Sequence, residues 1–200
     1  IRLPNAVNLA VFYPEDQVRN VDKCLRLLFS GAVIERKGLH ILLKAIARLQ
    51  AQSEVHKIVL KIAGPIYYDE YYDTCKSIIN DFPDCIEVDW LGFVSPIKNA
   101  IDWCDCLVLP SANEGMANAI LEGLACGKPF IGTYASGMTE LATKGAGILS
   151  ERTVDGVTNA MSQFYANKND VRWKETALST IKGKYDTDTV YNALMKLVKK

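Results

Sequence analysis

The 200-residue sequence has no excess of charge of either sign, because 23 basic side chains balance 23 acidic ones. A nucleic-acid-binding domain normally carries a basic excess, so we expect no nucleic-acid partner. No apolar run approaches the ~20 residues of a membrane span, and the first residues lack the uninterrupted apolar stretch of a secretion signal. With 49% of its residues hydrophobic, the chain can bury a core of its own. These features predict a soluble, cytoplasmic globular protein of one domain or two small ones.

Cysteine patterns typical of metal sites are also missing. The six cysteines form no C-x-x-C pair, and Cys104 and Cys106 stand too close together for the usual zinc spacing. Four of the six lie in or beside apolar stretches, which favours buried, reduced thiols. No Asp-x-Asp pair is placed to hold Mg²⁺. We therefore expect no metal and no other cofactor.

Short apolar runs alternate with segments of helical period along most of the chain. Strands are predicted at 25–30, 57–63, 86–91, 105–109 and 129–132, with a short sixth at 148–149. Helices are predicted at 39–49, 70–80, 96–103, 117–126, 154–164, 171–181 and 189–199. This alternation is typical of a doubly wound, Rossmann-like α/β fold: a parallel sheet of about six strands with helices on both faces. In such folds ligands bind at the carboxyl ends of the strands.

The clearest candidate for such a site lies within residues 107–131. A strand is followed by a polar loop with Glu114 and Gly115, and then by a helix that carries Glu122. A helix start offers unpaired N–H groups and a positive dipole end to a phosphate, and Gly115 leaves room for one. Glu122 is suited to accept two hydrogen bonds from a ribose diol, and Glu114 to meet a second sugar. On spacing alone, another interpretation is equally good: Glu114 is a solvated acid of the loop, and Glu122 is an ordinary helical glutamate without a role in binding.

The same stretch resembles the E-x7-E element of the retaining GT-B glycosyltransferases of family 4, also called group 1. Their usual run begins P-S-x-x-E-G and continues through L-E to A-x-G-x-P, and residues 110–131 match it in order. Four further segments resemble motifs of this family in the family's order: Leu3-Pro4-Asn5-Ala6-Val7, residues 30–38, Leu91-Gly92-Phe93-Val94 and Ser136-Gly137-Met138-Thr139-Glu140. The resemblance covers nearly the whole chain.

The resemblance implies that the chain is the nucleotide-sugar-binding half of a GT-B fold. Glu114 would be the catalytic group that touches the donor sugar, Glu122 would hold the nucleotide ribose, and Lys37 would bind the diphosphate. Phe93 and Val94 would lie near the base. The donor-binding residues implied are Lys37, Arg36, Gly31, Phe93, Val94, Gly115, Met116, Ala117, Asn118 and Glu122. Cations and helix N–H groups aimed at a leaving nucleoside diphosphate stabilise its growing charge without a metal.

One departure from the family pattern concerns the diphosphate. The family has an arginine five positions before the lysine, but Ala32 stands there, so half of the usual clamp is missing. Arg36 is a poor substitute for it, because neighbouring side chains at a helix start diverge. The two histidines, His40 and His56, fall within or beside predicted helix and strand, where surface or packing roles are expected rather than catalysis.

The resemblance also divides the chain. It implies an interdomain connecting segment (1–22), a donor-nucleotide-binding domain (23–185) and a C-terminal helix (186–200), with the N-terminal acceptor domain absent. The implied reaction transfers a sugar from an NDP-sugar of the UDP or GDP type to a hydroxyl acceptor, either a saccharide or a lipid-linked molecule, with retention of configuration. The isolated domain is expected to be inactive, and any peripheral contact with the inner membrane face would come through the missing half.

Two alternatives stay open. One is a UDP-sugar epimerase-like GT-B enzyme, which the E-x7-E run disfavours. The other is a non-catalytic nucleotide-sensing or interaction domain, which the loss at Ala32 supports. Separately, Tyr67, Tyr68, Tyr71 and Tyr72 surround a predicted helix start. They could form a stacking platform, but we expect them to pack on the core.

Overall fold

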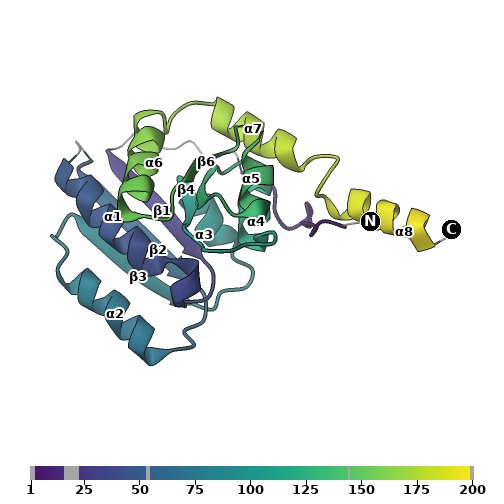
Figure 1. Ribbon diagram of the computed structural model, residues 1–200. Coiled ribbons are helices and arrows are strands. Elements are labelled where there is room, and N and C mark those ends of the chain that lie inside the picture. Colours follow the sequence, from purple (N-terminus) through teal and green to yellow (C-terminus); the bar gives the residue numbers. More distant parts are fainter. Residues whose placement is uncertain (1–2, 16–22, 53–54, 144, 199–200) are drawn as a thin grey trace.

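The computed structural model describes residues 3–15, 23–52, 55–143 and 145–198. One sheet of six parallel strands runs in the order β3-β2-β1-β4-β5-β6 (Figure 1). The strands are β1 (Cys24–Ser30), β2 (Lys57–Ala63), β3 (Ile86–Gly92), β4 (Cys106–Leu109), β5 (Phe130–Thr133) and β6 (Gly147–Ser150). The predicted Rossmann-like sheet of about six strands is therefore confirmed.

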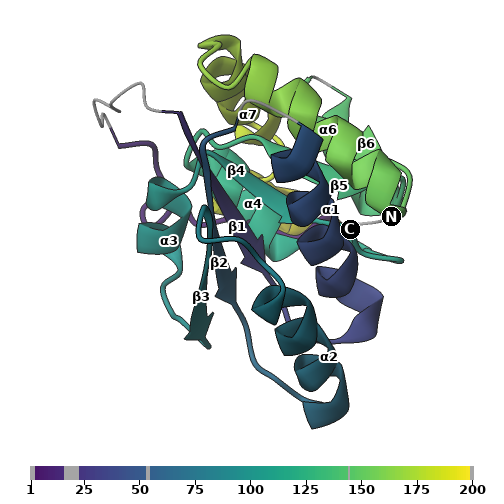
Figure 2. The same ribbon diagram turned by 90° about the vertical axis from the view of Figure 1, so that its left-hand side faces the viewer.

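Helices cover both faces of this sheet (Figures 1 and 2). Helices α1, α2 and α6 lie together on one face, and α3, α4 and α7 lie on the other, with α5 beside β5 and β6. The helices are α1 (Leu39–Gln52), α2 (Asp69–Asn80), α3 (Lys98–Trp103), α4 (Asn118–Ala125), α5 (Ser136–Ala142), α6 (Val154–Ala166), α7 (Arg172–Ile181) and α8 (Thr187–Val198). Among the described residues, none of these helices is long and apolar enough to cross a membrane.

The apolar runs of the sequence explain the position of the central strands. Leu27, Leu28 and Phe29 of β1 are fully buried, and all four residues of β4 are buried beside them. Side chains of a strand that is covered on both faces have no wet side, so a continuous apolar run is what such a strand requires. The core therefore places β1 and β4 in the middle, where the strand order reverses and a cleft opens at the carboxyl ends.

The edge strand β3 differs from the central strands. Glu87 and Asp89 are exposed, while Val88 and Trp90 point to the opposite face, where Trp90 packs edge-on against Tyr72 of α2. Charged side chains at an edge discourage pairing with another chain. Helical cover on this outer face is thus less complete at β3 than at the centre.

Two short elements were not predicted from the sequence. A 3₁₀ turn, η1 (Glu35–Lys37), precedes α1, and the seven-residue α5 follows β5. Within α5, Gly137 lies so close to the carbonyl of Gly115 that a Cβ there would collide with it. Short segments with an early glycine carry little helical periodicity, so only tertiary packing identifies them.

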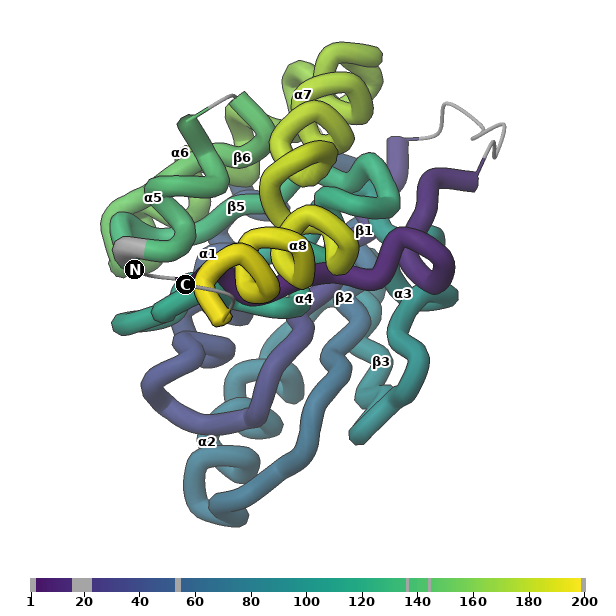
Figure 3. The backbone as a smooth tube through the Cα atoms, turned by 90° about the vertical axis from the view of Figure 1, so that its right-hand side faces the viewer, coloured from purple at the N-terminus to yellow at the C-terminus, as the bar shows by residue number. Residues whose placement is uncertain are grey.

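The first described residues and the last helix lie side by side (Figure 3). Val7 pairs with Asp186 in an isolated parallel bridge, and its N–H donates to the carbonyl of Tyr185 at 2.8 Å. Helix α8 then projects from the body and buries none of its residues (Figure 1). The predicted segments 1–22 and 186–200 fall partly on residues 1–2, 16–22 and 199–200, which lie outside the described residues, so these boundaries stay predictions.

The six cysteines agree with the expectation of thiols in apolar surroundings. Four are buried, and Cys24 and Cys85 are half-buried. No disulfide forms among the parts of the chain that the structure describes.

Candidate functional site

A cleft of about 550 Å³ opens at the carboxyl edge of the sheet. Its floor is closed by two backbone hydrogen bonds between strand ends: Gly31 N–H to the Ala63 carbonyl at 2.8 Å, and Gly64 N–H to the Gly92 carbonyl at 2.7 Å. The lining residues come from segments 11–12, 30–32, 63–65, 93–97 and 117–119, together with Lys37, Leu109 and Glu122. Of these described lining residues, Lys37 and Glu122 are the charged ones.

The loop that follows β4 is fixed against the η1 turn. The N–H of Ala112 donates to the carbonyl of Arg36 at 2.8 Å, and the buried Ser111 hydroxyl reaches the same carbonyl at 3.3 Å. The hydroxyl of Thr133, at the end of β5, donates to the carbonyl of Ser111 at 2.5 Å. The η1 turn and the end of β5 thus hold this loop, and the loop in turn sets the position of Glu114.

Lys37 and Glu114 form an ion pair beside the cleft. Lys37 Nζ lies 2.5 Å from Glu114 Oε1, and the two side chains are 16% and 8% exposed. Gly38 makes the approach possible: its φ of 75° ends the turn, and any side chain there would collide with the carbonyl of Pro110. The ammonium group that the family resemblance assigns to a diphosphate is thus paired with a carboxylate of the protein.

The start of α4 forms another wall. Ala117 has an extended backbone and precedes the helix, and Asn118 and Glu122 share one face because they are four positions apart. The first N–H groups of a helix have no partner within it. Burial raises the pKa of Glu122, so this carboxyl holds its proton at a higher pH than an exposed glutamate.

The side chains of Arg36 and Lys37 point in different directions, as predicted for neighbouring residues at a helix start. Arg36 Nη1 donates to the carbonyl of Asn113 at 2.7 Å, and its side chain lines a separate cavity of about 620 Å³ with His40 and Tyr71. Ala32, where the family has arginine, lines the cleft with no charge to offer. The predicted auxiliary role of Arg36 in diphosphate binding stays a prediction, and its side chain lies on the other side of the turn from the cleft.

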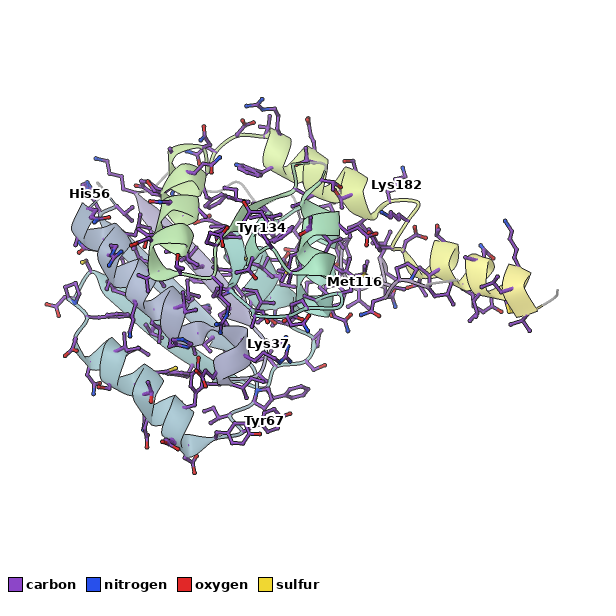
Figure 4. All side chains as sticks on the ribbon, in the orientation of Figure 1. Lys37, His56, Tyr67, Met116, Tyr134 and Lys182 are labelled. Carbon is purple, nitrogen blue, oxygen red and sulfur yellow. The ribbon has the colours of Figure 1, made fainter. Side chains whose placement is uncertain are left out.

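Most of the predicted donor-binding residues meet at this edge. Figure 4 labels two of the predicted residues, Lys37 and Met116. Those that line the cleft are Gly31, Lys37, Phe93, Val94, Ala117, Asn118 and Glu122. Phe93 is 78% exposed, which leaves its ring available to a ligand. Glu114, Gly115 and Met116 lie on the adjoining loop, and a Cβ on Gly115 would meet open space. The role of each residue in binding stays a prediction.

The histidines serve packing and surface roles. His40 Nδ1 lies 2.8 Å from the Tyr71 hydroxyl, and burial, with a smaller contribution from the positive charge of Arg152, lowers the pKa of His40. His56 is exposed and contacts Lys23. Neither histidine lines the cleft.

The prediction that all four tyrosines pack is only half correct. Tyr71 and Tyr72 pack against His40 and Trp90, whereas Tyr67 and Tyr68 are 65% and 64% exposed. Figure 4 shows Tyr67 projecting from the molecule. The two exposed rings lie in the loop before α2, where helical periodicity does not operate.

Two contributions to the site were missed by sequence reasoning. Arg152, after β6, donates to the carbonyls of Pro110 at 3.2 Å and Glu35 at 2.9 Å, and so ties together the two loops that carry Glu114 and Lys37. Asn5 donates from Nδ2 to the start of α4. No local pattern marks Arg152, and the motif containing Asn5 gave no hint of this contact.

Residues 24–167 match the family described as "Glycosyl transferases group 1". The chain belongs to the group 1 glycosyltransferases. Among curated relatives of this group 1 chain, the lipopolysaccharide core biosynthesis glycosyltransferase LpsE of Rhizobium meliloti is 26% identical over 171 residues, covering 84% of this chain and 48% of LpsE. The putative colanic acid biosynthesis glycosyltransferase WcaL of Salmonella typhimurium is 25% identical over 150 residues, covering 70% and 36%. The chain thus spans about half or less of the length of these relatives.

Solved structures of similar shape agree on the fold. The Anabaena protein Alr3699/HepE, in complex with UDP and glucose, superposes with a TM-score of 0.84 at 20% identity, covering 98% of this chain and 56% of that protein. The C-terminal domain of the group 1 family protein LpcC from Francisella tularensis gives 0.71 at 18% identity, covering 91% of this chain and 100% of that domain. This group 1 chain therefore has the fold of one Rossmann-like half of a GT-B glycosyltransferase.

Proposed function

We propose that this chain binds the donor of a retaining glycosyltransferase, which moves a sugar from an NDP-sugar of the UDP or GDP type to a hydroxyl acceptor. The observation that carries the proposal is the cleft at the carboxyl edge, where Lys37, the start of α4 and Glu122 border one space of about 550 Å³. That volume is in the range of small-ligand sites. The UDP and glucose held by the fold neighbour Alr3699/HepE support a nucleotide-sugar ligand.

Each group has chemistry suited to one part of such a donor. The carboxylate of Glu122 accepts hydrogen bonds from the two ribose hydroxyls. The ammonium group of Lys37 and the first N–H groups of α4 face the diphosphate. As the bond from the sugar to the diphosphate breaks, negative charge grows on the leaving phosphate. Fixed positive groups that need no reorganisation stabilise this charge.

Glu114 is the proposed catalytic group that touches the donor sugar. Its carboxylate is 8% exposed and lies within hydrogen-bond distance of Lys37. Binding of a diphosphate would draw the ammonium group away and leave the carboxylate to accept hydrogen bonds from sugar hydroxyls. The ion pair between Lys37 and Glu114 would thus be exchanged for contacts with the two parts of the donor.

The acceptor belongs to the part of the reaction that this chain does not cover. Because the chain spans about half of LpsE, we infer that a saccharide or lipid-linked acceptor is bound mainly by an additional domain. Any contact with a membrane would be made there as well, and a cytoplasmic location stays a prediction. By itself the chain is expected to bind nucleotide weakly and to transfer no sugar.

Calorimetric titration of the chain with UDP, GDP and ADP tests the proposal. One nucleoside diphosphate should bind selectively, and Glu122→Ala should abolish the heat of binding. Glu175→Ala is the matched control, because Glu175 is a helical glutamate on the exposed surface of α7 and should leave binding unchanged. Absence of binding by the unmodified chain to all three nucleotides would contradict the proposal.

A second candidate function is nucleotide sensing without catalysis. It is favoured by one observation: Ala32 leaves Lys37 as the cationic side chain among the described residues of the cleft. Both candidates require nucleotide binding, so the discriminating measurement is sugar transfer by the longer protein that contains this chain. Transfer that is lost with Glu114→Gln supports the enzyme. Unchanged nucleotide binding without any transfer supports the sensor.

A further inference from the structure

The connecting segment contacts the start of α4 through the side chain amide of Asn5. Asn5 Nδ2 donates to the carbonyl of Met116 at 3.2 Å and to Asn118 Oδ1 at 2.7 Å. Both acceptors belong to the turn that leads into α4. The contact joins positions more than a hundred residues apart in the sequence.

The backbone around Asn5 is held in place, so the amide is well positioned. Val7 is buried, and its N–H and carbonyl bond to Tyr185 and Thr187 at 2.8 and 3.1 Å. Asn5 lies two residues before this fixed point. Further along, the same segment contributes Phe12 to the cleft wall. The segment therefore touches the cleft region at two places, at Asn5 and at Phe12.

The bond to Met116 fixes the direction of the next N–H group. A trans peptide is planar, and the N–H of Ala117 points opposite to the carbonyl of Met116. Asn5 holds that carbonyl on its own side, and Ala117 lines the cleft. In the described part of the chain, the N–H groups of Ala117 and Asn118 have no hydrogen-bond acceptor. They are thus available to a ligand.

The bond to Asn118 controls which groups that side chain offers. An amide has one oxygen that accepts and one NH₂ group that donates. The bond from Asn5 holds the oxygen of Asn118 toward the connecting segment. Asn118 lines the cleft, and its NH₂ group on the other branch of the amide can donate to a ligand there. A donor is what an anionic phosphate requires.

We propose that Asn5 is a positioning residue for the diphosphate of the donor. It orients the Ala117 N–H and the Asn118 amide so that both donate toward the cleft, and it makes this geometry depend on the connecting segment. The inference rests on the proposed function, since it assumes that a nucleoside diphosphate occupies this cleft. Asn5 itself does not touch the ligand.

The test compares UDP with uridine, which lacks the diphosphate, by nuclear magnetic resonance titration of the whole chain. Asn5→Ala should weaken UDP binding about tenfold, as expected when one or two positioned hydrogen bonds are lost, and should leave uridine binding unchanged. Asn5→Asp should weaken UDP more, because a carboxylate cannot donate and repels the phosphate. If the chain selects GDP or ADP, guanosine or adenosine replaces uridine.

Asn8→Ala is the matched control. Asn8 lies in the same segment, is exposed, and its side chain bonds only to Ala10 N–H in the described structure. It should change neither affinity. A merely structural role of Asn5 would instead weaken UDP and uridine equally and lower the melting temperature, and that result would overturn the inference.

The outcomes separate this inference from the proposed function. If Glu122→Ala abolishes UDP binding and Asn5→Ala leaves UDP affinity unchanged, the proposed function survives and the role of Asn5 is refuted. If the unmodified chain binds no nucleoside diphosphate, the proposed function fails and the inference fails with it. In an Asn118→Ala background, removal of Asn5 should cost less than in the unmodified chain, because the two amides act together.

Discussion

The two ends of the sheet each carry a cavity with lysine in its wall, but the lysines are used differently. The carboxyl-edge cleft measures about 550 Å³ and the amino-edge cavity about 410 Å³. The volumes alone therefore do not distinguish a ligand site from a structural cavity. The two cavities differ in the groups to which their lysine side chains are bound.

At the amino edge, the protein itself uses the lysines. Lys128 Nζ donates to two backbone carbonyls at 2.6 and 3.0 Å, and Lys168 Nζ donates to the carbonyl of the first residue of β1 at 2.7 Å. Lys98 lies 2.6 Å from Asp102 and 2.9 Å from Glu15. An anion that took the ammonium groups of Lys128 and Lys168 would leave backbone carbonyls unsatisfied, at a cost of about 1–3 kcal/mol each where these are buried.

At the carboxyl edge, Lys37 has one hydrogen-bond partner among the described residues, the carboxylate of Glu114. A ligand phosphate can replace that carboxylate, and the carboxylate can turn to hydroxyls of the same ligand. The comparison teaches that Lys128 and Lys168, which donate to backbone carbonyls, hold the fold together, whereas Lys37, bound to the carboxylate of Glu114 beside the cleft, is available for exchange with a ligand.

The largest expected effect is on stability, at Lys98, the first residue of α3. Lys98→Met should lower the free energy of unfolding by about 3 kcal/mol, because it removes the ammonium group from the buried carboxylate of Asp102. Burial lowers the pKa of Lys98, but the hydrogen bonds to Asp102 and Glu15 raise it by more, so it ends above its ordinary value. The pair therefore contributes fully at neutral pH, and its contribution is lost only as the pH rises past ~10.4.

Urea denaturation measures this change, and the nucleotide affinity of the same variant is the control. We expect that affinity to stay within about twofold, because Lys98 does not line the nucleotide cleft. A stability loss confined to a few tenths of a kcal/mol would show that the ammonium group of Lys98 is exchangeable after all.

The next effect concerns nucleotide binding at the carboxyl edge. Lys37→Ala should weaken UDP binding about thirtyfold, since a charge-assisted hydrogen bond contributes about 1.5–3 kcal/mol. Lys128→Ala provides the comparison: it should lower the melting temperature and leave UDP affinity unchanged. Calorimetric titration of both variants with UDP measures the difference. If Lys37→Ala and Lys128→Ala bind UDP with equal affinity, the lysines of the two edges do not differ in the way proposed.

A smaller effect of opposite sign is expected from the partner of Lys37. Glu114→Gln removes the competing carboxylate, so UDP binding should tighten about three- to tenfold. A UDP-sugar should gain less, because the carboxylate is proposed to contact the sugar. Titrations with UDP and UDP-glucose measure the ratio. Weaker binding of UDP by this variant would mean that Glu114 does not compete for the lysine.

The smallest effect links stability to pH at Glu122. The pKa of this carboxyl is raised by burial, so its charged form destabilises the fold, and stability falls as the pH rises through the raised pKa. Glu122→Gln should therefore raise the melting temperature by about 1–3 °C near pH 7.5, with a smaller gain near pH 5. The same variant should bind UDP more weakly. Scanning calorimetry at both pH values checks the sign, and an equal shift at both would contradict it.

Much of the fold could be predicted from the sequence because local pattern and tertiary environment agree there. The run of β4 is apolar throughout and that of β1 is apolar apart from Arg26 and the final Ser30, as strands buried on both faces require. The E-x7-E stretch spans a strand end, a loop and a helix, so one run of residues carries one wall of the cleft. The η1 turn and α5 were missed because three or seven residues hold too little periodicity.

The contacts that assemble the site could not be predicted in the same way. Arg152 ties Pro110 to Glu35, and Asn5 meets Met116, across separations of 42 to 117 residues. No spacing rule connects such positions. Exposure of Tyr67 was likewise missed, because an aromatic residue in a loop has no period that assigns it to a face.

The bridge between Val7 and Asp186 has a consequence for how such a unit could be exchanged between proteins. Val7 and Asp186 lie side by side, so the segment between them begins and ends at the same place on the surface of the fold. Inserting that segment into another protein requires only two junctions that lie next to each other. Recombination at these two places would transfer a complete donor cleft, together with the Asn5 contact only if the upstream splice lies before it.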